Sequence, residues 1–89
     1  MKILDALEKK FPGCWFKPGN EFDGGHAAAW SGEGSSIDGM QAFDSYASGW
    51  DPKETVYVMG VKKELAEFVK SKGYFWEAYD SGTYLLFKA

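Results

Sequence analysis

Residues 74–87, with the sequence YFWEAYDSGTYLLF, restrict the fold more than any other stretch of the chain. Two runs rich in aromatic residues flank Ser81-Gly82, a pair that marks a tight turn. The sequence therefore predicts an antiparallel hairpin with strands at 74–79 and 83–88. A sheet of this kind has one face packed on the core and another that can face solvent, so each side chain has to be assigned to a face.

The length of the hairpin loop decides these faces. With Ser81 and Gly82 as the loop, Tyr79 stands opposite Tyr84. The face that we assign to the core then holds Trp76, Ala78, Leu85 and Phe87. The face that we assign to solvent or a partner holds Phe75, Glu77, Tyr79, Tyr84, Leu86 and Lys88. A three-residue loop with a bulge at Gly82 is equally allowed and exchanges the faces of the second strand. We favour the two-residue loop because it keeps Lys88 away from the core.

Two segments have the apolar spacing of amphipathic helices, 1–11 and 61–73. Pro12-Gly13 ends the first, and Gly73 ends the second. The run TVYVM at 55–59 predicts a strand, so the C-terminal order is strand, helix, strand, strand. This order predicts an α+β fold: a single small domain with two amphipathic helices packed on one face of a mostly antiparallel sheet.

The segment between the first helix and residue 49 is rich in glycine and in turn-forming pairs. We expect short strands at 14–17 and 26–31. Residues 36–48 allow two interpretations. Apolar residues recur at helical intervals, which favours a helix, but Asp38-Gly39 sits where its first turn would form and fits a strand, a turn and a second strand. We prefer the helix.

The charges are unevenly distributed. All ten cations are lysines, so the chain lacks the arginine fork that recognises phosphates and guanine, and direct nucleic-acid binding is disfavoured. Acidic residues gather in the middle of the chain. They form either solvated loops or a negative patch for a basic partner, such as a nucleic-acid-binding protein. The proposed acidic patch consists of Asp23, Glu33, Asp38, Asp44 and Asp51.

The chain offers little for catalysis. One cysteine excludes an internal disulfide, and one histidine excludes a Cys/His zinc cluster. Asp23, His26 and Asp38 are the best metal-ligand set, although a histidine in a glycine-rich turn is more often simply exposed. Cys14 with His26 as its base is weaker still. We expect no cofactor and no catalytic residue.

Compartment and surface follow from composition. No apolar run reaches the roughly 20 residues of a membrane span, and the N-terminus lacks the apolar core of a signal peptide, so a cytoplasmic protein without membrane contact is expected. A chain of 89 residues buries only about 60% of its unfolded surface, so most large apolar residues are needed in the core. Trp50 has polar neighbours on both sides, which makes it the tryptophan best suited to an interface.

Two stretches carry a resemblance to a known group of proteins: AWSGEGSSIDGMQAFDSY at 29–46 and VYVMGVKKELAEFVKSKGYFWEAYDSGTYLLFKA at 56–89. Their Gly-Glu-Gly stretch, Asp-Gly pair and closing Tyr-Asp-x-Gly-Thr hairpin resemble small uncharacterised proteins of tailed bacteriophages. The resemblance covers roughly residues 27 to 89 and implies a phage or prophage origin, with no assigned activity. Small proteins of that origin often bind a host or phage protein, and a bacterial host cytoplasm is then expected.

Three hypotheses about function follow. The preferred one is a non-enzymatic binding protein that acts as a phage-encoded inhibitor or accessory factor. The alternatives are a small metal-dependent hydrolase or metal-binding protein at Asp23, His26 and Asp38, and a homodimer that pairs open sheet faces. The predicted partner-binding residues are Phe75, Glu77, Tyr79, Tyr84, Leu86 and Trp50.

Overall fold

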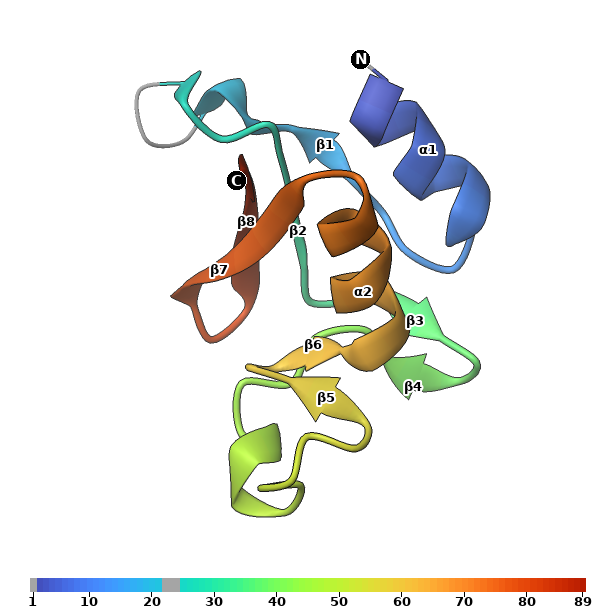
Figure 1. Cartoon of the computed structure of the whole chain (residues 1–89), viewed down its shortest axis with the longest axis vertical. Helices are drawn as coiled ribbons and strands as arrows, with labels where there is room; N and C mark the ends of the chain where they lie inside the picture. Colours follow the sequence, from blue (N-terminus) through green and yellow to red (C-terminus); the bar gives the residue numbers. More distant parts are fainter. Residues whose placement is uncertain (1, 22–24) are drawn as a thin grey trace.

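An antiparallel sheet with helices on one side organises the chain (Figure 1). A computed structural model describes residues 2–21 and 25–89. The main sheet has the strand order β1-β2-β8-β7, and each neighbouring pair is antiparallel. Its strands are β1 (Lys17–Pro18), β2 (Ala29–Gly32), β7 (Tyr74–Asp80) and β8 (Thr83–Lys88). Two short hairpins join β3 (Ser36–Ile37) to β4 (Met40–Gln41), and β5 (Tyr57–Val58) to β6 (Val61–Lys62).

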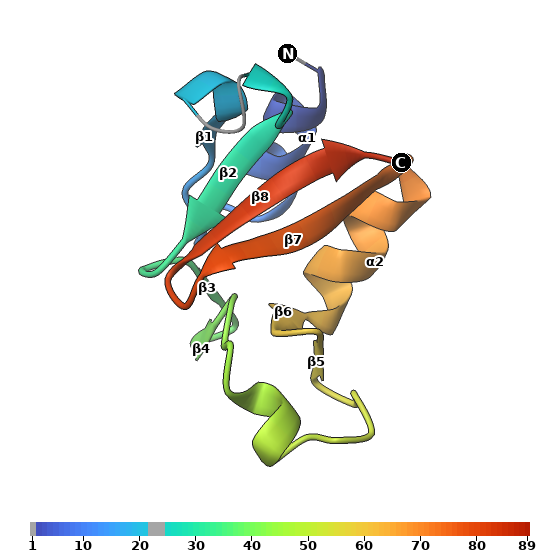
Figure 2. The same cartoon turned by 90° about the vertical axis from the view of Figure 1, so that its left-hand side faces the viewer.

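Both predicted helices are present and cover the same face of the sheet. They are α1 (Lys2–Lys10) and α2 (Lys63–Ser71). Figure 2 shows β2, β8 and β7 in front, with α1 and α2 behind them. Short 3-10 turns, η1 (Gly19–Glu21) and η3 (Ala47–Gly49), complete the assigned elements. The predicted α+β class is therefore confirmed.

The core lies between the helices and the covered face of the sheet. Each helix buries two residues four positions apart, because such residues share one helix face. Phe11, just beyond α1, meets Phe68 of α2 edge-to-face, with ring centroids 5.5 Å apart. The buried side chains of this layer are Ile3, Leu7, Leu65, Val69, Ala29, Tyr84 and Leu86.

The C-terminus of α2 leads directly into the hairpin. Gly73 has a φ of +86°, the left-handed conformation that commonly follows the last helical turn. Its N–H donates to the Lys70 carbonyl at 3.0 Å, and the Lys72 N–H donates to the Val69 carbonyl at 3.0 Å. The chain therefore reverses within two residues, and β7 starts beside the helix that precedes it.

The hairpin has the predicted turn but not the predicted register. Asp80 pairs with Thr83, so Ser81 and Gly82 form the two-residue loop. Tyr79, however, is an extra residue, a β-bulge that lies between the pairs Asp80–Thr83 and Ala78–Tyr84. Beyond it every pair is shifted by one residue, which exchanges the faces of β8.

This shift corrects the faces that the sequence analysis assigned to β8. Tyr84 is 1% exposed and Leu86 is fully buried, so both belong to the core and not to a partner surface. Tyr84 stacks on Phe43 with ring centroids 4.6 Å apart. Lys88 does not decide the register, because it is the last residue of β8, where its side chain is exposed on either face.

The preferred helix at 36–48 is wrong, and the strand–turn–strand alternative is correct for its first part. Asp38 and Gly39 have φ values of 52° and +79° and connect β3 to β4. Positive φ at both central residues defines a type I′ hairpin turn, for which Asp-Gly is among the best sequences. Only the 3-10 turn η3 is helical in the later part.

Other predicted strands are displaced or interrupted. The strand expected at 14–17 starts only at Lys17, and the one expected at 26–31 occupies Ala29–Gly32. The strand expected at 55–59 is shorter, because Met59 and Gly60 turn the chain back into β6. Since β6 runs directly into α2, this hairpin stays beside the helix.

We predict that Tyr84→Ala lowers the free energy of unfolding by about 3–5 kcal/mol, the usual loss for a buried aromatic side chain. Tyr79→Ala, on the neighbouring strand, should change it by less than about 1 kcal/mol, because Tyr79 is 61% exposed. Urea unfolding of both variants measures the difference. Equal losses would contradict the bulged register.

Candidate functional site

The open face, the side of the main sheet opposite the helices, is the first candidate surface. One cross-strand row runs over all four strands: Lys17 pairs with Trp30, Trp30 with Leu85, and Leu85 with Glu77. Opposed residues of neighbouring strands share a face, so this row lies on one side of the sheet. It has a cation at one edge, apolar side chains in the centre and a carboxylate at the other edge.

Aromatic rings extend this row in both directions. Trp15 packs edge-to-face on Trp30, with centroids 4.8 Å apart, and the Lys17 amine lies 5.8 Å from each ring. The Trp15 indole N–H donates to the Glu33 carbonyl at 2.9 Å, which fixes the ring. Near the other edge, the rings of Phe75 on β7 and Phe87 on β8 lie side by side, with centroids 5.8 Å apart.

A shallow hollow of about 250 Å³ opens beside Glu77, between Tyr79, Leu85 and Phe87. Tyr79 is the bulge residue and remains largely exposed. A carboxylate flanked by aromatic rings is suited to a cationic side chain, through a charge-assisted hydrogen bond and cation–π contact. The hollow therefore has the chemistry to hold a lysine or arginine of another molecule.

The structure brings together only part of the predicted partner-binding set. Phe75, Glu77 and Tyr79 lie together, as either register required. Tyr84 and Leu86 are in the core. Trp50 is 55% exposed, but it packs edge-to-face on Tyr57 in the segment after η3, which Figure 2 shows at the opposite end of the molecule from β1.

Two residues of the open face, Trp30 and Phe87, were not predicted from the sequence. Leu85 points to this face as well, but it is only 5% exposed, so its predicted burial is correct and only its predicted face is wrong. The correct hairpin register would have identified Leu85 and Phe87. Trp30 gave no separate indication, because tryptophan in so small a domain is first of all core material. Its cross-strand neighbours, Lys17 and Leu85, become known only when the sheet is assembled.

The proposed acidic patch does not form a continuous surface among the described residues. Glu33 and Asp38 are exposed, and Asp38 lies in the β3–β4 turn. Asp44 is half-buried and accepts the backbone N–H of Tyr46 at 3.0 Å. Glu33 and Asp44 share one hollow of about 220 Å³. Asp51 is buried, and Asp23 lies outside the described residues.

Asp51 has a structural role in place of the predicted surface role. Its carboxylate accepts four hydrogen bonds: from the Thr55 hydroxyl at 2.6 Å and from the backbone N–H groups of Thr55, Val56 and Tyr57 at 2.8–3.0 Å. These donors, above all the Thr55 hydroxyl, hold the pKa of Asp51 well below its usual value. The carboxylate thereby fixes the loop that leads into β5.

The structure adds nothing in favour of the metal or thiol hypotheses. His26 and Asp38 are exposed, and within the described ranges no three His, Cys, Asp or Glu side chains gather as a metal site would require. Because Asp23 lies outside those ranges, the metal site stays a prediction. Burial raises the pKa of the Cys14 thiol, against the lowering effect of hydrogen bonds with Ser35 and Ser36, so the reactive thiolate is disfavoured.

Comparison with known proteins gives no match: no family model, curated protein or solved structure is significantly similar to the chain. Over the part that the structure describes, no helix has both the length and the apolar character of a membrane span. The fold and the candidate site together define the class of this protein: an α+β domain that displays an open aromatic sheet face.

We predict that Asp51→Asn lowers the urea midpoint at pH 7, because an amide nitrogen would face backbone donors. The pKa of Asp51 is lower in the folded state, so its stabilisation is present above the unfolded value of about 3.9 and is lost as pH falls below it. The difference between variant and wild type should therefore shrink between pH 5 and pH 2. Asp38→Asn, at an exposed turn position that tolerates Asn, is the control; a constant difference for Asp51→Asn would contradict this role.

Proposed function

We propose that this chain is a non-enzymatic binding protein whose open face contacts a protein partner. Its resemblance to small phage proteins supports an inhibitor or accessory factor that acts on a host or phage protein. The proposed binding role requires no catalytic residue.

The hollow beside Glu77 is the observation that supports this proposal most. Tyr79 is 61% exposed and lines the hollow beside the Glu77 carboxylate, and Phe75, two positions before Glu77 on β7, is 44% exposed. Exposed aromatic side chains are the residues that most often dominate the energy of protein interfaces. A ring next to a carboxylate combines apolar contact area with a defined charge, which favours a specific partner.

The charge of the hollow favours a basic partner surface. Glu77 would receive a lysine or arginine, and the rings of Tyr79 and Phe87 would stack on its alkyl chain or its cation. At the opposite edge Lys17 would face an acidic group. A nucleic-acid-binding protein, whose binding surface is rich in basic residues, has the required chemistry.

Self-association through the same face is the competing hypothesis. Two open faces would bring Lys17 of one copy to Glu77 of the other in an antiparallel arrangement, a complementary pairing. Sedimentation at 5 µM and 500 µM distinguishes the two hypotheses. We expect a monomer mass at both concentrations. A dimer at the higher concentration that Glu77→Gln dissociates would show that the open face binds a second copy of the chain and not a foreign partner.

We predict that Glu77→Gln combined with Tyr79→Ala reduces partner binding at least tenfold, because it removes both the charge and the exposed ring. A tagged full chain is used to capture proteins from a bacterial lysate, and the captured protein is purified and its affinity measured for each variant. The folded state of the variant is checked by urea unfolding.

The control combines Glu8→Gln with Tyr46→Ala, an exposed glutamate of α1 and a tyrosine that is even more exposed than Tyr79. It should bind as the wild type does. If both double variants lose the partner to the same extent, the open face is not the binding surface.

A further inference from the structure

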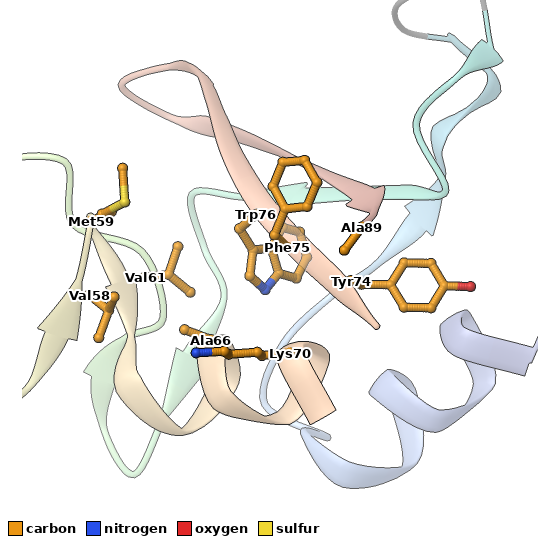
Figure 3. Close-up of a pocket in the computed structure, with 9 residues that line it drawn as sticks. All are labelled: Val58, Met59, Val61, Ala66, Lys70, Tyr74, Phe75, Trp76 and Ala89. Carbon is orange, nitrogen blue, oxygen red and sulfur yellow. The ribbon is translucent and has the colours of Figure 1, made fainter. Parts of the chain in front are cut away.

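A second apolar surface lies at the free edge of β7, away from the centre of the open face. A cleft of about 340 Å³ opens between β7, α2 and the β5–β6 hairpin (Figure 3). This volume is near the lower end of the range of about 300–1,000 Å³ for ligand sites. Its lining residues are Val58, Met59, Val61, Ala66, Lys70, Tyr74, Phe75, Trp76 and Ala89.

The edge of β7 offers unused backbone groups above this cleft. Ala89 donates its N–H to the Gly73 carbonyl at 2.8 Å, so Gly73 and Ala89 form a hydrogen-bonded pair. In an antiparallel ladder such pairs alternate with pairs whose backbone groups point outward. The N–H and C=O groups of Trp76 and Ala78 therefore point away from β8, and they have no partner among residues 2–21 and 25–89.

Met59 is placed at the rim of the cleft against its own backbone preference. It has a φ of 52° in the β5–β6 turn, a conformation in which Asn, Asp or Gly is favoured. Its side chain is nonetheless apolar and 84% exposed. Strained positions of this kind cluster at binding sites, and a flexible methionine adapts well to the shape of a bound group.

Two polar groups in the cleft also lack partners. The Trp76 indole N–H is closed to water and donates to no atom in the described part of the chain. Figure 3 shows its nitrogen on the side of the ring that faces Ala66 and Lys70. The Lys70 amine makes no ion pair within residues 2–21 and 25–89. An acidic ligand group would complement this amine.

We propose that the cleft binds an extended peptide segment, which adds a strand to the free edge of β7. Trp76 and Ala78 would supply the backbone hydrogen bonds, as in other strand-addition sites. Alternate side chains of an added strand point to opposite faces, so one apolar side chain would enter the cleft beneath β7. An acidic residue of the segment would pair with Lys70.

A single extended segment fits this edge better than a second copy of the chain. Edge-to-edge pairing of two β7 strands about a two-fold axis perpendicular to the sheet keeps both helix layers on the same side. Each copy would then bring its own α2 and β5–β6 hairpin to the joint, where the first copy already has these elements (Figure 2). A single extended peptide brings no helix layer of its own and so avoids this crowding.

The test uses a displayed library of random linear ten-residue peptides, selected on the full chain. We expect enriched sequences that lack proline at their centre and combine alternating apolar residues with an acidic residue. In the complex, the amides of Trp76 and Ala78 should become at least tenfold slower in hydrogen exchange, whereas those of Phe75 and Glu77, already bonded to β8, should change little. Failure to enrich any peptide, or binding without this alternation, would overturn the proposal.

Met59→Asn separates binding from stability. Asn suits the left-handed turn position, so thermal unfolding should occur at the same or a higher temperature, while binding of the selected peptide should weaken at least tenfold. Met40→Ala, at another exposed methionine, should leave binding unchanged. If Met59→Asn binds as wild type does, the cleft is not the site.

Lys70→Gln tests the charge, with Lys63→Gln at the exposed start of α2 as its control. Lys70→Gln should weaken binding of the selected peptide three- to tenfold, and only at low salt, whereas Lys63→Gln should leave it unchanged. If the amides of Trp76 and Ala78 become more protected from hydrogen exchange as protein concentration rises, with no peptide present, a second copy is the occupant. That result would overturn the proposal. The open-face variants carry Met59 and Lys70 unchanged, so either surface can fail its test without the other.

Discussion

The extra residue at Tyr79 is the constraint on which the rest of the structure depends. A turn of two residues and a bulge of one residue together shift β7 against β8 by one position. Because side chains alternate along a strand, this shift decides the face of every residue in β8. With it, Tyr84 and Leu86 enter the core, and Leu85 and Phe87 take the open face. Without it, the core would receive a different set of side chains and the hollow beside Glu77 would not form.

Tyr84 explains why the bulged register is the stable one. Its ring stacks on Phe43, and its hydroxyl lies so close to Gly60 that a Cβ at that position would be 2.5 Å away. Gly60 also needs its positive φ to form the β5–β6 turn. The main sheet, the residues after β4 and the hairpin that precedes α2 therefore meet at one buried tyrosine. The alternative register would leave a leucine or a phenylalanine to fill this space.

Local patterns in the sequence predict the elements that depend on local interactions. Both helices, the Ser81-Gly82 turn and the α+β class follow from apolar spacing and from turn-forming residues. The register does not, because the bulge is stabilised by Phe43 and Gly60, which are remote from the turn in the sequence. The segment at 36–48 fails for the opposite reason: Ile37, Met40 and Phe43 have helical spacing, but Asp38-Gly39 forms a local hairpin turn that overrides it. The site was accordingly found on β7, where both registers agree, and missed on β2 and β8.

The two proposed surfaces share β7, and this sharing has a physical consequence. An exposed edge strand tends to pair with other chains, and proteins usually protect such edges with lysine, proline or a bulge. β7 contains neither lysine nor proline, and its bulge lies near the turn, so Trp76 and Ala78 remain open. The protection that it does have comes from Glu77 on the open face and from α2 with Met59 beside the cleft. These groups allow only a narrow extended segment to reach the free edge of β7. The same groups hinder the edge-to-edge pairing of whole chains that leads to aggregation.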